Sequence, residues 1–184
     1  KRVSVGDAGS GVEFNARQIL EAYDITFEDI SVNNLGFGDS SDALKDGKID
    51  AFFCTAGAPT TAIVELATTN DINLLAIDDE HAAKLAEAYP FYTTYPIPGG
   101  SYKGVDNDVQ TVAIKATLIC SPDLAEETVY NLTKAIFDNQ AEIAAAHAKG
   151  QELSLEYATT GISVPFHPSA EKYFKEPEKL IHAG

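Results

Sequence analysis

With 184 residues, 45% of them hydrophobic and 22% charged, the chain has the composition of a globular protein with one substantial core. Its formal net charge of −15 at pH 7 argues against nucleic acid or an anionic membrane surface as a partner, because both require a dense basic face. The sequence contains neither the run of about 18 apolar residues that spans a bilayer nor a signal-peptide pattern. The chain starts directly before a predicted strand and has no methionine, so we expect a mature or excised piece.

The chain opens with a predicted strand, a glycine-rich turn and a helix. Val3 and Val5 are β-branched, and three glycines between residues 6 and 11 allow a sharp turn. Ser10, with Glu13 three residues later, gives the pattern of a capping box. A helix N-terminus with unpaired N–H groups can bind a carboxylate or phosphate. The alternative is that these residues only cap the helix and turn the chain. The glycine order matches neither a dinucleotide fingerprint nor a P-loop, which argues against a nucleotide site.

Three further pairs of a strand and a helix are expected before residue 90. The strands are predicted at 30–32, 49–54 and 72–77, and the helices at 41–48, after the turn at 55–61, and at 80–88 with Asp79 as its cap. Four such pairs in succession predict a parallel sheet with right-handed crossovers. Ligands bind at the carboxyl ends of the strands in such sheets, where the first turn and the turn at 55–61 both lie.

The second half of the chain changes character. Residues 91–102 form an aromatic and proline-rich extended stretch that either lines a pocket or covers the sheet, and residues 109–120 predict one long strand. From residue 121 the pattern is helical, with helices at 124–140, at about 141–149 and around Tyr173 and Phe174. We therefore expect two domains, an α/β ligand-binding lobe at residues 1–120 and C-terminal helices at residues 121–184.

The cysteines and histidines suggest no cofactor. Cys54 and Cys120 each end a β-like run, which allows a disulfide or two buried free thiols, and we expect the free thiols. The histidines have no metal-ligand spacing near either cysteine; they are His81, His147, His167 and His182. An enzyme would need a nucleophile with a base, a metal set or a cofactor lysine, and no such set is recognisable. We expect no metal, no cofactor and no catalysis.

Five separated motifs carry a resemblance to a known family. They are GSGVEFNAR at 9–17, LKDGKIDAFF at 44–53, YPFY at 89–92, IPGGSY at 97–102, and VPFHPSA at 164–170 with Tyr173. In this order, and over nearly the whole chain, they resemble the TAXI-family solute-binding proteins of TRAP transporters. Residues 180–184 extend past the resemblance.

The resemblance implies a type II periplasmic-binding-protein fold, with a three-layer αβα lobe whose mostly parallel sheet has one long antiparallel returning strand. It implies an exported bacterial protein of the periplasm that binds a small carboxylated solute such as glutamate. The partner would be the membrane subunits of a TRAP permease. A first lobe precedes the matching segment in that family, so this chain looks like the second lobe with its returning helices. We expect either an apo fragment or a dimer formed through the surfaces left by the missing lobe.

Carried over position by position, the resemblance implies a set of ligand contacts. The set is Ser10, Gly11, Asn15, Gly57, Ala58, Thr60, Thr61, Tyr95 and Tyr102. Ser10 and Gly11 would contribute backbone N–H groups, whereas the two tyrosines fit sheet cover equally well. Glu13 and Asp50 would repel a carboxylate, so we assign them to capping or salt bridges.

Two other functions stay open. One is a ligand-sensing or immunogenic surface module of the same fold, for which the sequence offers no distinguishing feature. The other is an enzyme, since type II lobes are shared by some deaminase-like and aminotransferring catalysts and a fold does not fix a function. Stabilisation by a ligand without turnover would separate a receptor from an enzyme.

Overall fold

The computed structural model describes residues 1–176, so the predictions for His182 and for residues 180–184 lie outside the described residues. The chain divides into two compact units, Lys1–Ala113 and a second that begins at Ile114. The division falls within the stretch that the sequence predicts as one long strand.

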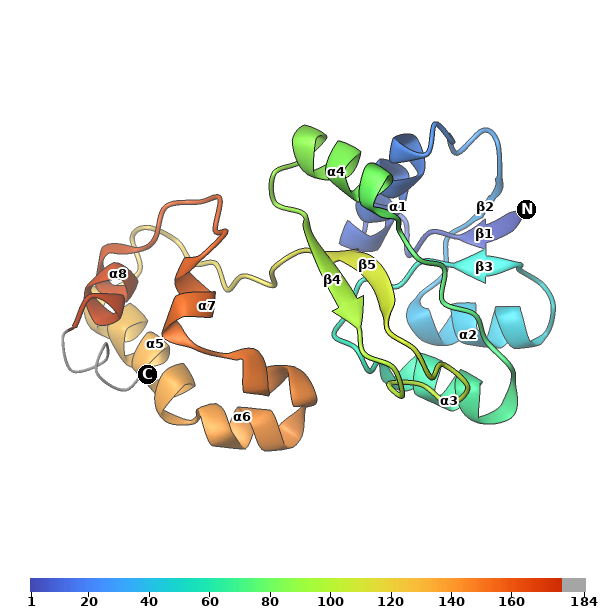
Figure 1. Cartoon of the computed structure of the whole chain (residues 1–184). Coiled ribbons are helices and arrows are strands. Elements are labelled where there is room, and N and C mark those ends of the chain that lie inside the picture. The colour runs from blue at the N-terminus through green and yellow to red at the C-terminus, as the bar shows by residue number, and fades with distance from the viewer. Residues whose placement is uncertain (177–184) are drawn as a thin grey trace. The chain divides into compact units, whose positions relative to one another are not determined.

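The N-terminal unit alternates short strands with helices (Figure 1). In chain order its elements are β1 (Arg2–Ser4), α1 (Gly11–Ala22), β2 (Ser31–Asn33), α2 (Phe37–Lys45), β3 (Ala51–Phe52), α3 (Thr61–Thr69), α4 (Asp79–Ala88), β4 (Thr93–Ile97) and β5 (Val109–Ala113). Strands β2, β1 and β3 form a parallel sheet in that order, with Val3 of β1 paired to Val32 on one side and to Ala51 on the other. The predicted parallel α/β architecture is confirmed. Helix α2 starts earlier than predicted, directly after the extended residue Gly36.

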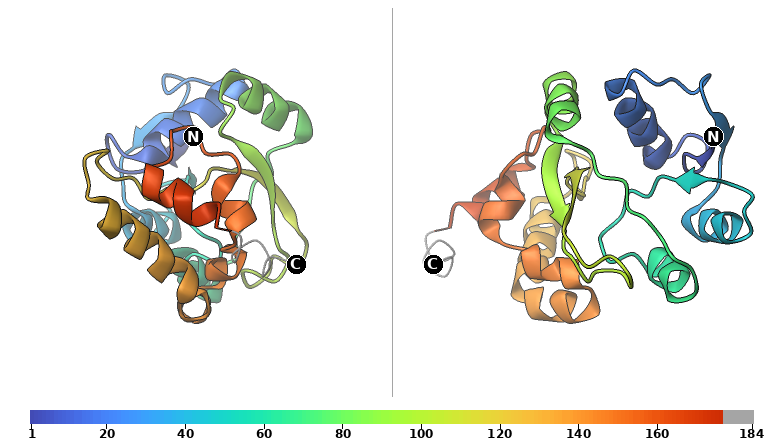
Figure 2. Two further views of the ribbon diagram at one scale, coloured as in Figure 1. Left: turned by 90° about the vertical axis from the view of Figure 1, so that its left-hand side faces the viewer. Right: turned by 45° about the vertical axis from the view of Figure 1, so that its right-hand side comes forward.

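Side-chain alternation along the central strand places one helix on each face of this sheet. Val3 and Val5 pack against Ala16 of α1 in a shared core cluster. Ser4 points to the opposite face, where its hydroxyl oxygen lies 2.8 Å from that of Ser40 on α2. Helices α1 and α2 therefore lie on opposite faces of the strands, as Figures 1 and 2 show, and the three layers are helix, sheet and helix.

The prediction of a strand at residues 72–77 is wrong, because this segment pairs with no strand among the described residues. Ile72 and Leu74 instead pack as irregular chain against the core cluster that contains Tyr102. Ile77 donates its N–H to the Gln110 carbonyl at 3.0 Å. The apolar side chains thus fill a core without forming a ladder.

A two-stranded antiparallel sheet completes the unit. β4 pairs with β5, from Thr93 opposite Ala113 to Ile97 opposite Val109. The strand is shorter than the predicted range of 109–120, since residues beyond Ala113 have no strand partner in the part of the chain that the structure describes. An antiparallel strand is therefore present, but it is shorter than predicted and pairs with β4 in a separate sheet, whereas a return into the parallel sheet was expected.

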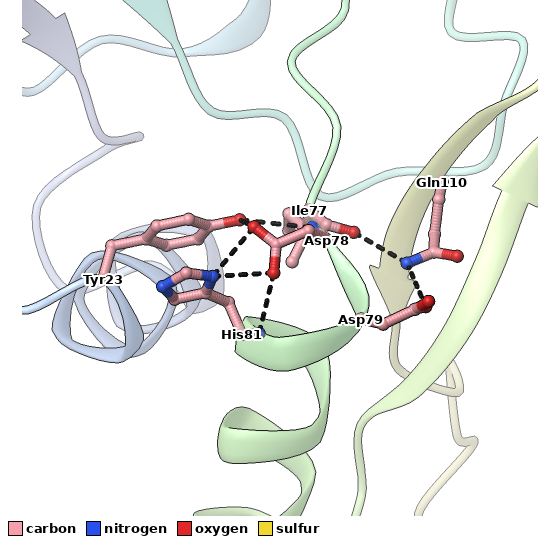
Figure 3. Close-up of polar contacts among 6 residues, drawn as sticks. All are labelled: Tyr23, Ile77, Asp78, Asp79, His81 and Gln110. Atoms are coloured by element: carbon pink, nitrogen blue, oxygen red, sulfur yellow. Dashed lines mark hydrogen bonds and ion pairs between the residues drawn. The ribbon is translucent and has the colours of Figure 1, made fainter.

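Tyr23 and His81 fasten the end of α1 to the start of α4 (Figure 3). Their rings stack with centroids 3.7 Å apart and planes 8° apart. Asp78, and not the predicted Asp79, is the N-cap of α4; it accepts the His81 N–H at 3.0 Å and the Tyr23 hydroxyl at 3.3 Å. The hydrogen bond from the His81 backbone, followed by the contact with the His81 ring, holds the pKa of Asp78 below its usual value.

The second unit is helical over its described residues. Its elements are α5 (Glu126–Asp138), α6 (Gln140–Ala146), the 3₁₀ helix η1 (Ala148–Glu152), α7 (Leu155–Thr159) and α8 (Pro168–Phe174). Tyr173 of α8 is 1% exposed and its ring contacts Tyr130 and Phe137 of α5. The helix predicted at 141–149 ends at Ala146, and Gly150 follows in a position too close to α6 for any side chain. Among residues 1–176, no helix has the length and apolarity needed to cross a membrane.

Candidate functional site

The loops that lead into α1 and α3 leave the same edge of the parallel sheet. β1 and β3 are neighbours that run in the same direction, so the loops that leave them start at the same edge. The chain goes from β1 to β2 on one side and then returns across β1 to β3, which makes the β1–β3 junction the point where the strand order reverses. Open α/β sheets bind ligands at the carboxyl ends of strands beside such a junction.

Ser10 and Glu13 shape the start of α1. The Ser10 hydroxyl accepts the Glu13 N–H at 3.2 Å, and the Glu13 carboxylate accepts the Gly9 N–H at 2.6 Å. The predicted cap at Ser10 is therefore confirmed, with Glu13 reaching one residue further back than in an ordinary capping box. Gly6 has a φ of +90°, and a side chain there would meet Val12 at 2.6 Å, so only glycine fits. The exposed Gly11 is the first helical residue, whose N–H has no acceptor within the helix.

Asn15 lies further along α1 and its side chain is turned into the protein. It is 8% exposed, and its Nδ2 donates to the Tyr92 hydroxyl at 2.6 Å. Tyr92 in turn donates to Oε1 of Gln18 at 2.7 Å, and burial raises the pKa of Tyr92, so its hydroxyl remains a donor at neutral pH. The Oδ1 atom of Asn15 is buried and has no hydrogen-bond partner among the described residues.

Tyr92 and Gln18 were not singled out from the sequence as partners of Asn15. Gln18 follows Asn15 by three residues on one helix face, a spacing that could have indicated it. Nothing in the sequence indicated Tyr92, which lies far along the chain in the link between α4 and β4.

The turn before α3 forms the second part of the site. Thr60 donates its hydroxyl to the Gly57 carbonyl at 3.0 Å and its backbone N–H to the Tyr102 hydroxyl at 3.0 Å. Between Gly57 and Thr60, the Ala58–Pro59 peptide bond is cis. Thr61 is exposed and is the first residue of α3, so its N–H also lacks an acceptor within the helix.

The two predicted tyrosines lie away from this edge or inside the protein. Tyr102 is 4% exposed, and its hydroxyl already accepts the Thr60 N–H. Tyr95 is half-buried within β4, opposite Thr111, in the antiparallel sheet. Of the predicted contacts, Ser10, Gly11 and the turn up to Thr61 are the ones that lie in the segments following β1 and β3.

The two carboxylates that the sequence analysis assigned to capping or salt bridges, those of Glu13 and Asp50, are both engaged by other groups. Asp50 forms a salt bridge with Arg2 at 2.6 Å, and the hydrogen bond from Arg2 holds the pKa of Asp50 well below its usual range. Glu13 accepts the Gly9 N–H and lies 4.0 Å from the guanidinium of Arg17. The assignment of both carboxylates to capping and salt bridges is confirmed.

The two cysteines differ from each other. Both are free, as predicted. Cys54 is partly buried; burial raises the pKa of its thiol, and a hydrogen bond with Thr60 offsets part of that rise. Cys120 is exposed, so the prediction that it is buried is wrong, because the strand predicted to end at Cys120 stops at Ala113.

What this edge offers chemically is a set of hydrogen-bond donors. Each of the two helices entered from this edge begins with N–H groups that have no acceptor within the helix, and the positive end of its dipole favours an anion such as a carboxylate. Within residues 1–176, no group of three or more His, Cys, Asp and Glu side chains is arranged to hold a metal ion.

Comparison with protein families agrees with this arrangement. The model of the NMT1-like family matches residues 1–177, which is nearly the whole chain. This is a periplasmic-binding-like family, and the match covers both turns at the sheet edge as well as the C-terminal helices. The chain belongs to the NMT1-like family.

Proposed function

We propose that the chain is the solute-binding component of a TRAP transporter and that it binds a small carboxylated solute such as glutamate. The observation that carries the proposal is that the neighbouring parallel strands β1 and β3 each lead, from the same edge of the sheet, into a loop and then a helix, α1 and α3. A carboxylate at this edge would accept N–H groups such as those of Gly11 and Thr61, and both helix dipoles would favour its charge.

Three further observations support the proposal. The NMT1-like match gives the class of protein, and the motifs at 9–17 and 97–102 give the resemblance to TAXI-family receptors. The acidic residues Glu13 and Asp50 are already paired, so neither opposes a bound anion as a free charge. The net charge of −15 does not exclude an anionic ligand, because local donors govern a binding site. In this role the protein works in the periplasm, performs no catalysis and delivers its solute to the membrane subunits of the permease.

A thermal-shift screen tests the proposal. The panel contains glutamate, glutamine, small dicarboxylates and keto acids, and intact mass is measured before and after each incubation. One class should raise the melting temperature in proportion to the logarithm of its concentration, because it binds only the folded state. The mass of protein and solute should not change. A shift accompanied by turnover would favour the enzyme of related fold instead.

A matched pair of variants tests the site itself. Gly11→Pro removes the N–H at the first helical position, where proline fits the helix, and Gly11→Ala keeps that N–H. A Cβ atom at Gly11 has open space around it, and Ser10 before it has the extended backbone that a residue preceding proline prefers. Gly11→Pro should weaken binding by about 10-fold, the cost of one hydrogen bond to a charged group, whereas Gly11→Ala binds like the wild type. A panel that produces no shift, or equal binding by both variants, would contradict the proposal.

A further inference from the structure

The loop between β4 and β5 contacts α3 at both of its ends. At the N-terminal end, the Tyr102 hydroxyl accepts the Thr60 N–H at 3.0 Å. At the C-terminal end, the Lys103 ammonium donates to the Thr68 carbonyl at 3.1 Å. An acceptor at the start of a helix and a cation at its end both complement the unpaired groups there. The two contacts therefore fix the position of α3 along its own axis.

The loop that presents Tyr102 is itself closely held. Gly100 donates its N–H to the Val105 carbonyl at 2.7 Å, and Val105 donates to the Tyr102 carbonyl at 3.0 Å. Gly99 donates to the Asp108 carboxylate at 2.8 Å. Gly100 has a φ of +80°, which side chains other than hydrogen resist. The backbone of Tyr102 is thus constrained before its side chain reaches α3.

Burial determines what Tyr102 can touch. Its side chain is 4% exposed and shares a core cluster with Ala67 of α3 and with Val105 of its own loop. Half-buried side chains surround that cluster; they include Ile63, Ile97 and Val109. A solute at the sheet edge could reach the Tyr102 hydroxyl only if the ring left this core. The hydroxyl acts on the protein, through Thr60.

We infer that Tyr102 is a positioning residue of the solute site. It holds the turn at Gly57–Thr60 so that the first N–H groups of α3, beginning with that of Thr61, face the bound carboxylate. The resemblance to TAXI-family receptors gives Tyr102 as a ligand contact, and this inference replaces that role with an indirect one. It rests on the proposed function, because it takes the start of α3 as part of the binding site.

Tyr102→Phe tests the inference, since it keeps the ring in the core and removes only the acceptor for Thr60. The variant should bind the solute identified by the screen about 10-fold more weakly, because one hydrogen bond that aligns the donors is lost. Amide hydrogen exchange at Thr60 should accelerate, while exchange in the first turn of α1 stays at the wild-type rate. The melting temperature without solute should change little. Tyr89→Phe is the control, because the Tyr89 hydroxyl makes no hydrogen bond with any described residue.

The outcomes separate this inference from the proposed function. A wild-type chain that binds nothing in the panel overturns the proposed function and the role of Tyr102 with it. A wild-type chain that binds, with a Tyr102→Phe variant of equal affinity, overturns the role of Tyr102 alone. A Tyr102→Phe variant that loses affinity only because the whole unit unfolds, with exchange accelerated everywhere, also overturns it, since that result marks a core residue and not a positioning one.

Discussion

Asn15 has a polar side chain that is buried, and its amide is paired with one neighbour, the hydroxyl of Tyr92. That hydroxyl accepts from Asn15 and donates to Gln18, so a single oxygen pairs with two side chains. Tyr92→Phe should therefore reduce the free energy of unfolding by about 1–3 kcal/mol, since it leaves the buried Asn15 amide without a partner. Urea unfolding of the wild type, Tyr92→Phe and the control Tyr89→Phe measures the difference.

The double variant Asn15→Leu with Tyr92→Phe sharpens this prediction. Replacing both buried partners with apolar groups removes the unsatisfied amide and the orphaned Oδ1 together. Its free energy of unfolding should lie above that of Tyr92→Phe alone, while the partly exposed Gln18 regains water as a partner. A double variant less stable than Tyr92→Phe would contradict the prediction. It would show that the unpaired Asn15 amide is not what destabilises the single variant.

The two thiols should react at different rates. Cys120 is exposed, whereas Cys54 is partly buried and burial raises the pKa of its thiol, which lowers the thiolate fraction. Maleimide at pH 7 should label Cys120 at least about 10-fold faster than Cys54, as followed by intact mass. Cys120→Ser should remove the fast phase and leave the slow one. If Cys54→Ser removes the fast phase instead, the assignment is wrong.

At the scale of elements, Asp78 couples the junction of α1 and α4 to pH. Its pKa is lowered from the ordinary 3.8, so the carboxylate form stabilises the folded state. That contribution is fully present above the ordinary pKa and is lost as the pH falls through it toward the folded value. Asp78→Asn keeps a capping oxygen and removes the titration, so its stability should fall less steeply than that of the wild type between about pH 5 and pH 3.

Urea unfolding at stepped pH measures this slope. The wild type and Asp78→Asn should differ most above about pH 5 and converge in acid, where both side chains are uncharged. Glu80→Gln removes a charge from the first turn of the same helix and controls for charge alone. If Glu80→Gln flattens the profile as much as Asp78→Asn does, the contacts of Asp78 in Figure 3 are not the cause.

Features that depend on neighbours in sequence could be predicted, and features that depend on distant partners could not. The cap at Ser10 is local, because its hydrogen bond spans three residues, and the sequence predicts it. Ile72 and Leu74 alternate as the residues of a strand do. A strand also needs a neighbouring strand to pair with, and within residues 1–176 this segment has none, so both side chains pack against a core cluster. The contact between Tyr102 and Thr60 joins residues 42 apart through a loop set by Gly100, which no local pattern reveals. The edge proposed as the binding site was therefore predictable from the sequence, whereas the contact between Tyr102 and Thr60 was not.

For the whole molecule, the most distinctive segment is the start of the second unit. Residues 116–125 form no helix or strand in the described part of the chain, and every one of them is exposed. Leu118 and Ile119 are 71% and 78% exposed although both favour burial. Backbone without ladder or helix hydrogen bonds opens with little cost, which makes it the preferred site of proteolysis.

Limited proteolysis with thermolysin, which cuts before large apolar residues, tests this property of the chain. The first cut within the described residues should fall at Leu118 or Ile119 and release two fragments that correspond to the two units. Leu75 is 78% exposed as well, but its neighbours Leu74 and Ile77 are anchored by core packing and by a hydrogen bond to Gln110, so cleavage there should be slower. The double variant Leu118→Ser with Ile119→Ser should resist the first cut, and Leu75→Ser should not. Cleavage at Leu75 before Leu118 would contradict the two-unit organisation, because the weakest backbone would then lie inside the N-terminal unit and not where the second unit begins.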